Sequence, residues 1–97
     1  LPAVMEYNLP GLEEKVKRMS EAMQFTDHSV DGFKNNLNQM LDRLKIPNGL
    51  NEIGVPEDCY ERIAKKSMLD QAYGQNPKKA KLDEVKELTL KSIKKAR

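Results

Sequence analysis

Residues 46–56 contain two prolines and two glycines, in a chain whose other segments repeat their apolar residues at helical spacing. Proline lacks an N–H and pushes the residue before it out of the α region, so one helix should end just before this stretch and another should begin near Pro56. Between these limits Leu50 and Ile53 stand ahead of Gly54, a pattern typical of a single helical turn closed by glycine. We expect both apolar side chains to pack between the two longer helices.

Apolar residues recur at steps of three and four in the rest of the sequence, and no stretch alternates with a period of two. The most regular segment follows Ser29, a good N-cap residue, and should provide the core. Pro10 suits the first turn of the helix before it. The expected helices cover about residues 1–7, 10–23, 29–44, 56–70 and 82–96. We therefore predict an all-α fold without a sheet, a bundle of about five helices with a one-turn helix near residues 48–53.

A length of 97 residues allows one small domain, and we expect residues 1–97 to form a single helical domain. Apolar residues make up 38% of the sequence and charged residues 33%, a balance typical of soluble globular proteins. No segment has the pattern of a membrane span or of a signal peptide. The single cysteine, Cys59, excludes an internal disulfide, and we expect a reducing, cytoplasmic location. Because the first residues have the pattern of a helix end, we also expect a piece of a longer polypeptide.

Positive charge gathers in residues 78–97, which hold eight Lys and Arg against three Asp and Glu. Two interpretations are open. Lysines such as Lys91, Lys94 and Lys95 can neutralise the phosphates of a polyanion, or they can lie on a solvated last helix and complement the negative end of its dipole. Because no aromatic residue alternates with these lysines, we favour the solvated helix and expect no nucleic-acid partner.

Side chains that carry out chemistry are scarce. His28 is the only histidine and has no second ligand at metal-binding spacing, so we interpret it as a surface residue of a loop. Cys59 falls in the first turn of a helix, but no histidine lies near it in the sequence to act as a base, and we interpret it as a packing residue. The glycines match neither a dinucleotide-binding nor a phosphate-binding loop. We therefore predict no catalytic, cofactor-binding or metal-binding residue in this protein segment.

Five short motifs follow one another along the sequence. They are Leu-Pro-x-Val-Met-x-Tyr-Asn at residues 1–8, Ile-Pro-x-x-Leu-x-Glu-Ile-Gly at 46–54, an alanine-containing helix at 63–67, Asn-Pro at 76–77 and the start of the last helix at 82–85. In this order they resemble the C-terminal helical domain of the iron-containing alcohol dehydrogenases, whose metal domain is similar to that of dehydroquinate synthase. The resemblance covers nearly all of the 97 residues.

The resemblance implies a parent enzyme several times longer than these 97 residues. In that family an N-terminal α/β domain binds NAD or NADP, and the helical domain binds a divalent metal, iron or zinc, through an aspartate and histidines. These ligands belong to helices that precede the Leu-Pro-x-Val-Met motif, and His28 matches none of them. Residues 1–97 would then be the C-terminal part of the metal domain, without the nucleotide-binding domain, the ligand helices or a cofactor of their own.

One loop lies near the substrate pocket in this family. Many relatives carry a cysteine before the Asn-Pro motif, and that position corresponds to Ala72, with Tyr73 and Gly74 beside it. The resemblance thus implies that these three residues line the pocket, although they can equally be ordinary loop residues that shape a turn. Lys81 stands where the family usually has a threonine cap.

We expect this chain to be a C-terminal fragment of an NAD(P)-dependent and metal-dependent alcohol dehydrogenase, inactive in isolation. Its partners would be the N-terminal domain of the parent protein and, through exposed apolar helix faces, further copies of itself. The alternative is a stand-alone helical interaction module whose basic last helix binds a protein or a polyanion.

Overall fold

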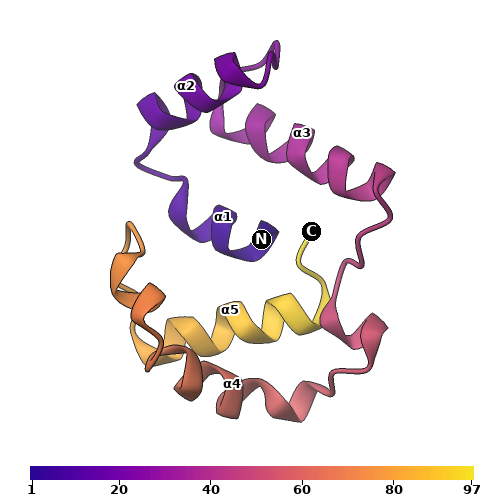
Figure 1. Ribbon diagram of the computed structural model, residues 1–97, viewed down its shortest axis with the longest axis vertical. Helices are drawn as coiled ribbons and strands as arrows, with labels where there is room; N and C mark the ends of the chain where they lie inside the picture. The colour runs from indigo at the N-terminus through magenta and orange to yellow at the C-terminus, as the bar shows by residue number, and fades with distance from the viewer. The chain divides into compact units, whose positions relative to one another are not determined.

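The computed structural model describes residues 1–97, and all its regular elements are helices (Figure 1). The α-helices are α1 (Pro2–Asn8), α2 (Glu13–Ala22), α3 (Val30–Arg43), α4 (Tyr60–Ser67) and α5 (Leu82–Lys94), and the 3-10 helices are η1 (Leu50–Ile53), η2 (Glu57–Cys59) and η3 (Gln71–Gln75). The prediction of an all-α fold with about five helices, a one-turn helix near residues 48–53 and no sheet is confirmed. No helix is both long enough and apolar enough to cross a lipid bilayer.

The polypeptide divides into two compact units, Leu1–Ile46 and Pro47–Arg97. In the first unit α3 contacts both α1 and α2. The buried core of this unit consists of Met5, Leu9, Val16, Phe33 and Leu37. Phe25 packs on this core, with its ring centroid 5.9 Å from that of Phe33. The segment that follows Ser29 therefore provides two of the core residues, in agreement with its regular apolar spacing.

The start of α2 differs from the sequence prediction. The helix begins at Glu13 rather than at Pro10, so the expected start was wrong. Gly11 has φ +90°, a backbone conformation that an α-helix cannot include. The N–H of Gly11 donates to Glu13 Oε1 at 3.0 Å. Pro10 and Gly11 thus form a turn, and the carboxylate of Glu13 satisfies an amide ahead of the helix.

A polar turn fixes the start of α3. Ser29 is the N-cap residue, as predicted, and its Oγ accepts a hydrogen bond from the N–H of Gly32 at 3.0 Å. Asp27 Oδ1 in turn accepts a hydrogen bond from the N–H of Ser29 at 2.9 Å. The side-chain and main-chain hydrogen bonds from Ser29 hold the pKa of Asp27 below its ordinary value of 3.8, because they stabilise the carboxylate.

Replacing Ser29 by alanine should lower the free energy of unfolding by about 1 kcal/mol, because the N–H of Gly32 loses its cap. The pKa of Asp27 should rise toward its ordinary value, because its largest stabilising interaction is removed. In the wild type, a carboxylate with a lowered folded-state pKa adds stability above its unfolded pKa and loses that contribution as the pH falls through the folded one. Urea denaturation and an NMR titration of Asp27 measure the two effects. Ser29→Thr keeps the hydroxyl and should change both the free energy of unfolding and the pKa of Asp27 far less. Changes as large as those of Ser29→Ala would show that the hydroxyl does not cap the helix.

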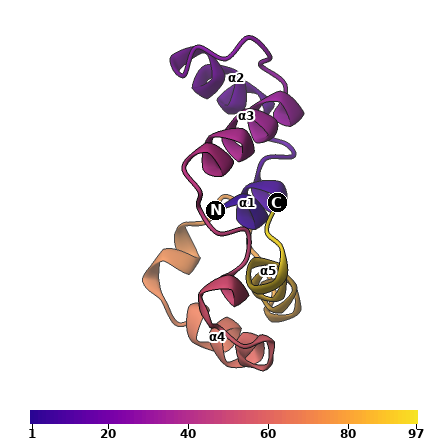
Figure 2. The ribbon, with the colours of Figure 1, turned by 90° about the vertical axis from the view of Figure 1, so that its right-hand side faces the viewer.

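The second unit packs α4 against α5, which run in opposite directions and lie side by side in both views (Figures 1 and 2). Ala64 of α4 and Ile93 of α5 are fully buried, and Ala80 is buried just before α5 begins. Both η1 and η2 also contact α5. The last helix is therefore the central element of this unit.

The one-turn helix lies where it was predicted, and Gly54 ends it with φ +92°. The expectation for its side chains was wrong, since Leu50 is 39% exposed and Ile53 is 64% exposed. The buried residue is Gly49, where an added Cβ would lie 2.5 Å from main-chain oxygens at the end of α5. The backbone at Gly49 thus packs directly against the end of α5. The side chains of Leu50 and Ile53 therefore do not pack between the helices.

The helix expected over residues 56–70 is shorter and less regular. Pro56 is extended and is followed by the 3-10 turn η2, and α4 covers only Tyr60–Ser67. Cys59 therefore lies in a 3-10 turn, where it is half-buried.

Candidate functional site

The loop that the resemblance places near a substrate pocket is held in shape by its own side chains. Ala72, Tyr73 and Gly74 all lie in η3. Asp70 Oδ1 accepts a hydrogen bond from the N–H of Ala72 at 2.8 Å, and the hydroxyl of Tyr73 donates to the main-chain oxygen of Ala80. Ala72 and Gly74 are exposed, whereas Tyr73 is half-buried with its hydroxyl occupied.

The end of the same loop is closed by Asn76, whose Nδ2 donates to the main-chain oxygen of Lys78 at 2.6 Å. The side chains of Asp70, Tyr73 and Asn76 all form hydrogen bonds with main-chain atoms of this loop or its flanks. These bonds fix the conformation of the loop backbone. It presents small residues and backbone rather than a nucleophile, an acid or a base. The assignment of Ala72, Tyr73 and Gly74 to a substrate pocket stays a prediction.

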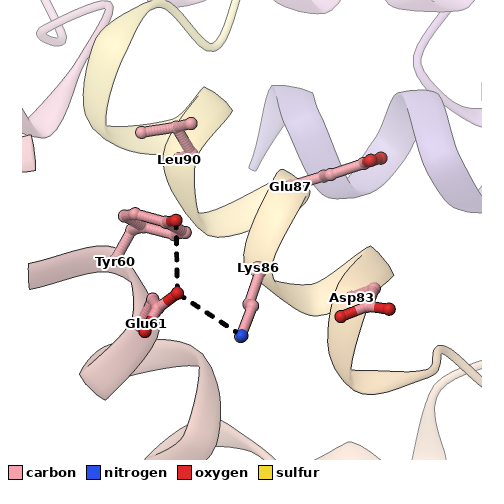
Figure 3. Close-up of a pocket in the computed structure, with 6 residues that line it drawn as sticks. All are labelled: Tyr60, Glu61, Asp83, Lys86, Glu87 and Leu90. Carbon is pink, nitrogen blue, oxygen red and sulfur yellow. Dashed lines mark hydrogen bonds and ion pairs between the residues drawn. The ribbon is translucent and has the colours of Figure 1, made fainter. Parts of the chain in front are cut away.

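An open groove of about 410 Å³ lies between α4 and α5 (Figure 3). Its lining residues are Tyr60, Glu61, Asp83, Lys86, Glu87 and Leu90. The Nζ atom of Lys86 lies 3.5 Å from Glu61 Oε1, and the hydroxyl of Tyr60 donates to the same oxygen at 3.4 Å. Glu61 thereby links the two helices across the groove, which gives this cluster a structural role.

Sequence reasoning did not identify this groove. One signal was present, because Asp83, Lys86, Glu87 and Leu90 share one face of a helix by their spacing. Nothing in the sequence shows that this face meets Glu61, which lies 25 residues from Lys86 in the sequence. Figure 3 shows Glu87 pointing away from Glu61, so the groove carboxylates do not converge on one point.

The remaining candidate residues lie apart from one another. His28 Nε2 lies 2.9 Å from the main-chain oxygen of Phe25, and Nδ1 lies 4.0 Å from Glu21 Oε1 in an exposed turn. Cys59 Sγ accepts a hydrogen bond from Arg62 at 3.4 Å. No group of three or more His, Cys, Asp or Glu side chains is arranged to hold a metal ion.

The lysines of the basic segment extend past the end of α5. Lys91, Lys94 and Lys95 are exposed, and Lys91 and Lys94 lie in the last turn, where they complement the helix dipole. Lys81 precedes the first residue of α5, and its side chain makes no capping hydrogen bond because an ammonium group has no acceptor atom. Instead, the N–H of Lys81 donates to Glu84 Oε1 at 3.2 Å.

Comparisons with known proteins identify relatives of this protein. Residues 1–93 match the model of the "Fe-containing alcohol dehydrogenase family, C-terminal". The protein is also similar to a 4-hydroxybutyrate dehydrogenase from Cupriavidus necator, with 25% identity over an alignment of 97 positions, which covers 96% of this chain and 25% of the relative. It thus spans about a quarter of the length of that relative. No solved structure matches significantly.

Proposed function

This chain belongs to the iron-containing alcohol dehydrogenase family through the C-terminal domain of that family, and on this premise we propose that it forms the C-terminal helical part of an NAD(P)-dependent and metal-dependent alcohol dehydrogenase. The match of residues 1–93 to the family model is the observation that supports the proposal. The reaction of the whole enzyme would interconvert an alcohol with an aldehyde or a ketone. The 4-hydroxybutyrate dehydrogenase makes a hydroxy acid the first substrate to test.

The proposed role of these residues is to support the fold and to shape one wall of the pocket. They do not fit a metal ion, because no three suitable side chains converge. The metal and the nicotinamide cofactor that the family uses would therefore be held by other residues of the whole enzyme. Ala72 and Gly74 are the exposed residues proposed to reach the substrate, on a loop held by Asp70 and Tyr73.

The isolated 97-residue protein should show no NAD(P)-dependent oxidation of 4-hydroxybutyrate or of short alcohols, with or without added iron or zinc. A chimera provides the positive test. In it, these 97 residues replace the matching C-terminal quarter of the 4-hydroxybutyrate dehydrogenase from Cupriavidus necator. We expect the chimera to fold and to oxidise 4-hydroxybutyrate at a measurable rate, while the relative lacking that quarter should be inactive. Metal-dependent turnover by the isolated protein, or a folded chimera without turnover, would contradict the proposal.

The loop assignment can be tested in the same chimera. Ala72→Trp places a large side chain on the exposed part of η3 and should lower kcat/KM by about tenfold or more if this loop lines the pocket. Ala22→Trp is the matched control, because Ala22 is exposed on α2, and it should leave kcat/KM unchanged. Equal kcat/KM values for the two variants would show that Ala72 does not line the substrate pocket.

A further inference from the structure

Asn48 holds the backbone beyond α5 through three hydrogen bonds, which we call the Asn48 clasp. Its main-chain oxygen accepts from the N–H of Ala96 at 2.8 Å. Its Oδ1 accepts from the N–H of Arg97 at 2.8 Å, and its Nδ2 donates to the main-chain oxygen of Arg97 at 2.9 Å. Both polar atoms of the side-chain amide are therefore bonded to one residue, which lies 49 positions away in the sequence.

The residue after Asn48 makes this amide chemically reactive. Asn48 is the only asparagine in the sequence that precedes a glycine. In an Asn-Gly pair, the backbone nitrogen of glycine attacks Cγ of asparagine, the bond between Cγ and Nδ2 breaks, ammonia leaves and a succinimide ring forms. One water molecule then adds to either ring carbonyl and opens the ring to aspartate or isoaspartate. Glycine favours this reaction because it has no side chain to hinder the ring closure.

The Asn48 clasp opposes the ring closure. Both polar atoms of the Asn48 amide are bonded to Arg97, so a rotation of the side chain that carries Cγ toward the backbone nitrogen of Gly49 breaks both side-chain hydrogen bonds. Gly49 is buried, with φ −141°, against main-chain oxygens of Ile93 and Lys94, so its backbone has little room to move toward Cγ. Two neutral hydrogen bonds of ordinary net strength slow a step that requires their loss by about tenfold to a hundredfold.

We propose that Asn48 is a deamidation site whose reaction the Asn48 clasp holds back, and that deamidation, once it occurs, opens the clasp irreversibly. The reaction consumes one water and releases one ammonia, with no change of oxidation state. The product no longer has the Nδ2 donor, and an aspartate at pH 7 has only acceptor atoms to place against the main-chain oxygen of Arg97. Isoaspartate also adds a methylene to the backbone, which displaces Gly49 from its position against α5.

The test follows deamidation of the intact 97-residue protein at neutral pH and physiological temperature, by mass spectrometry of the peptide that contains Asn48. Deleting Arg97 removes both partners of the side-chain amide and leaves the bond from Ala96. We expect this deletion to accelerate deamidation by about tenfold to a hundredfold. Arg97→Ala is the matched control, because it removes the Arg97 side chain, including the hydrogen bond from Nη1 to the main-chain oxygen of Pro47 at 3.4 Å, and keeps both main-chain partners of the Asn48 amide. Its rate should stay close to that of the wild type. Equal rates for the deletion and for Arg97→Ala would overturn the proposal.

Two further measurements keep the test decisive if the deletion disturbs the fold. The wild-type protein in urea has no clasp and should deamidate faster than the folded protein; equal rates would show that the fold gives no protection. Asn48→Asp mimics the aspartate product, and amide hydrogen exchange at Ala96 and Arg97 should become about tenfold faster or more in this variant. Unchanged exchange at both amides would show that deamidation leaves the clasp closed.

Discussion

Replacing Phe33 by alanine should lower the free energy of unfolding by about 3 to 5 kcal/mol. Phe33 is 4% exposed and lies in the core cluster of the first unit. Its loss removes both the transfer free energy of the ring and the contacts that surround it, because the helices around the vacated space relax only in part. The tilted contact with the ring of Phe25 disappears as well. Urea denaturation followed by circular dichroism measures the change.

Two variants separate core burial from the loss of an aromatic pair. Phe25→Ala removes the same ring contact from a half-buried position and should cost clearly less than Phe33→Ala. Phe33→Leu keeps most of the volume and should cost less than about 1.5 kcal/mol. A Phe25→Ala variant as unstable as Phe33→Ala would show that the core does not centre on Phe33.

Replacing Gly49 by alanine should lower the free energy of unfolding by about 3 kcal/mol, although only one methyl group is added. The new Cβ would lie 2.5 Å from the main-chain oxygens of Ile93 and Lys94. These atoms belong to the end of α5 and cannot turn aside as a flexible side chain can, so the two segments must separate. The φ of Gly49 is −141°, which any residue adopts, and the predicted loss is therefore steric.

Gly74→Ala is the matched control for Gly49→Ala. An added Cβ at Gly74 meets no atom within 4 Å, and its φ lies outside the left-handed region. The free energy of unfolding should stay within about 0.5 kcal/mol of the wild type. Equal losses in the two variants would show that the close approach at Gly49 does not exist in solution.

The helices were predictable where one local rule decides the conformation. Ser29 caps α3 because its hydroxyl and the N–H of Gly32 are fixed by nearby residues. The same kind of rule failed at Pro10, because Gly11 takes a left-handed conformation that proline alone does not reveal. It also failed at Leu50 and Ile53, whose spacing predicts burial, because the neighbouring Gly49 brings the backbone itself against α5.

The candidate sites also differ in whether neighbouring residues of the sequence define them. The loop at Ala72, Tyr73 and Gly74 was predicted through a linear motif, which is visible in a sequence, and its place in a substrate pocket stays a prediction. The groove at Glu61 and Lys86 was not found, because it forms only when two helices meet across 25 residues of sequence. The same holds for Asn48 and Arg97, where the interacting residues have no sequence pattern in common.

The hydrogen bonds between Asn48 and Arg97 also limit how early the second unit can complete its folding during protein synthesis. The partners of its side-chain amide are main-chain atoms of Arg97, so neither bond can form until that residue has left the ribosome. Until then α4 can already pair with α5, while the side-chain amide of Asn48 lacks both of its partners. A nascent polypeptide in which Arg97 is still inside the ribosome would therefore leave the segment around Asn48 less firmly held and more open to chaperones and proteases.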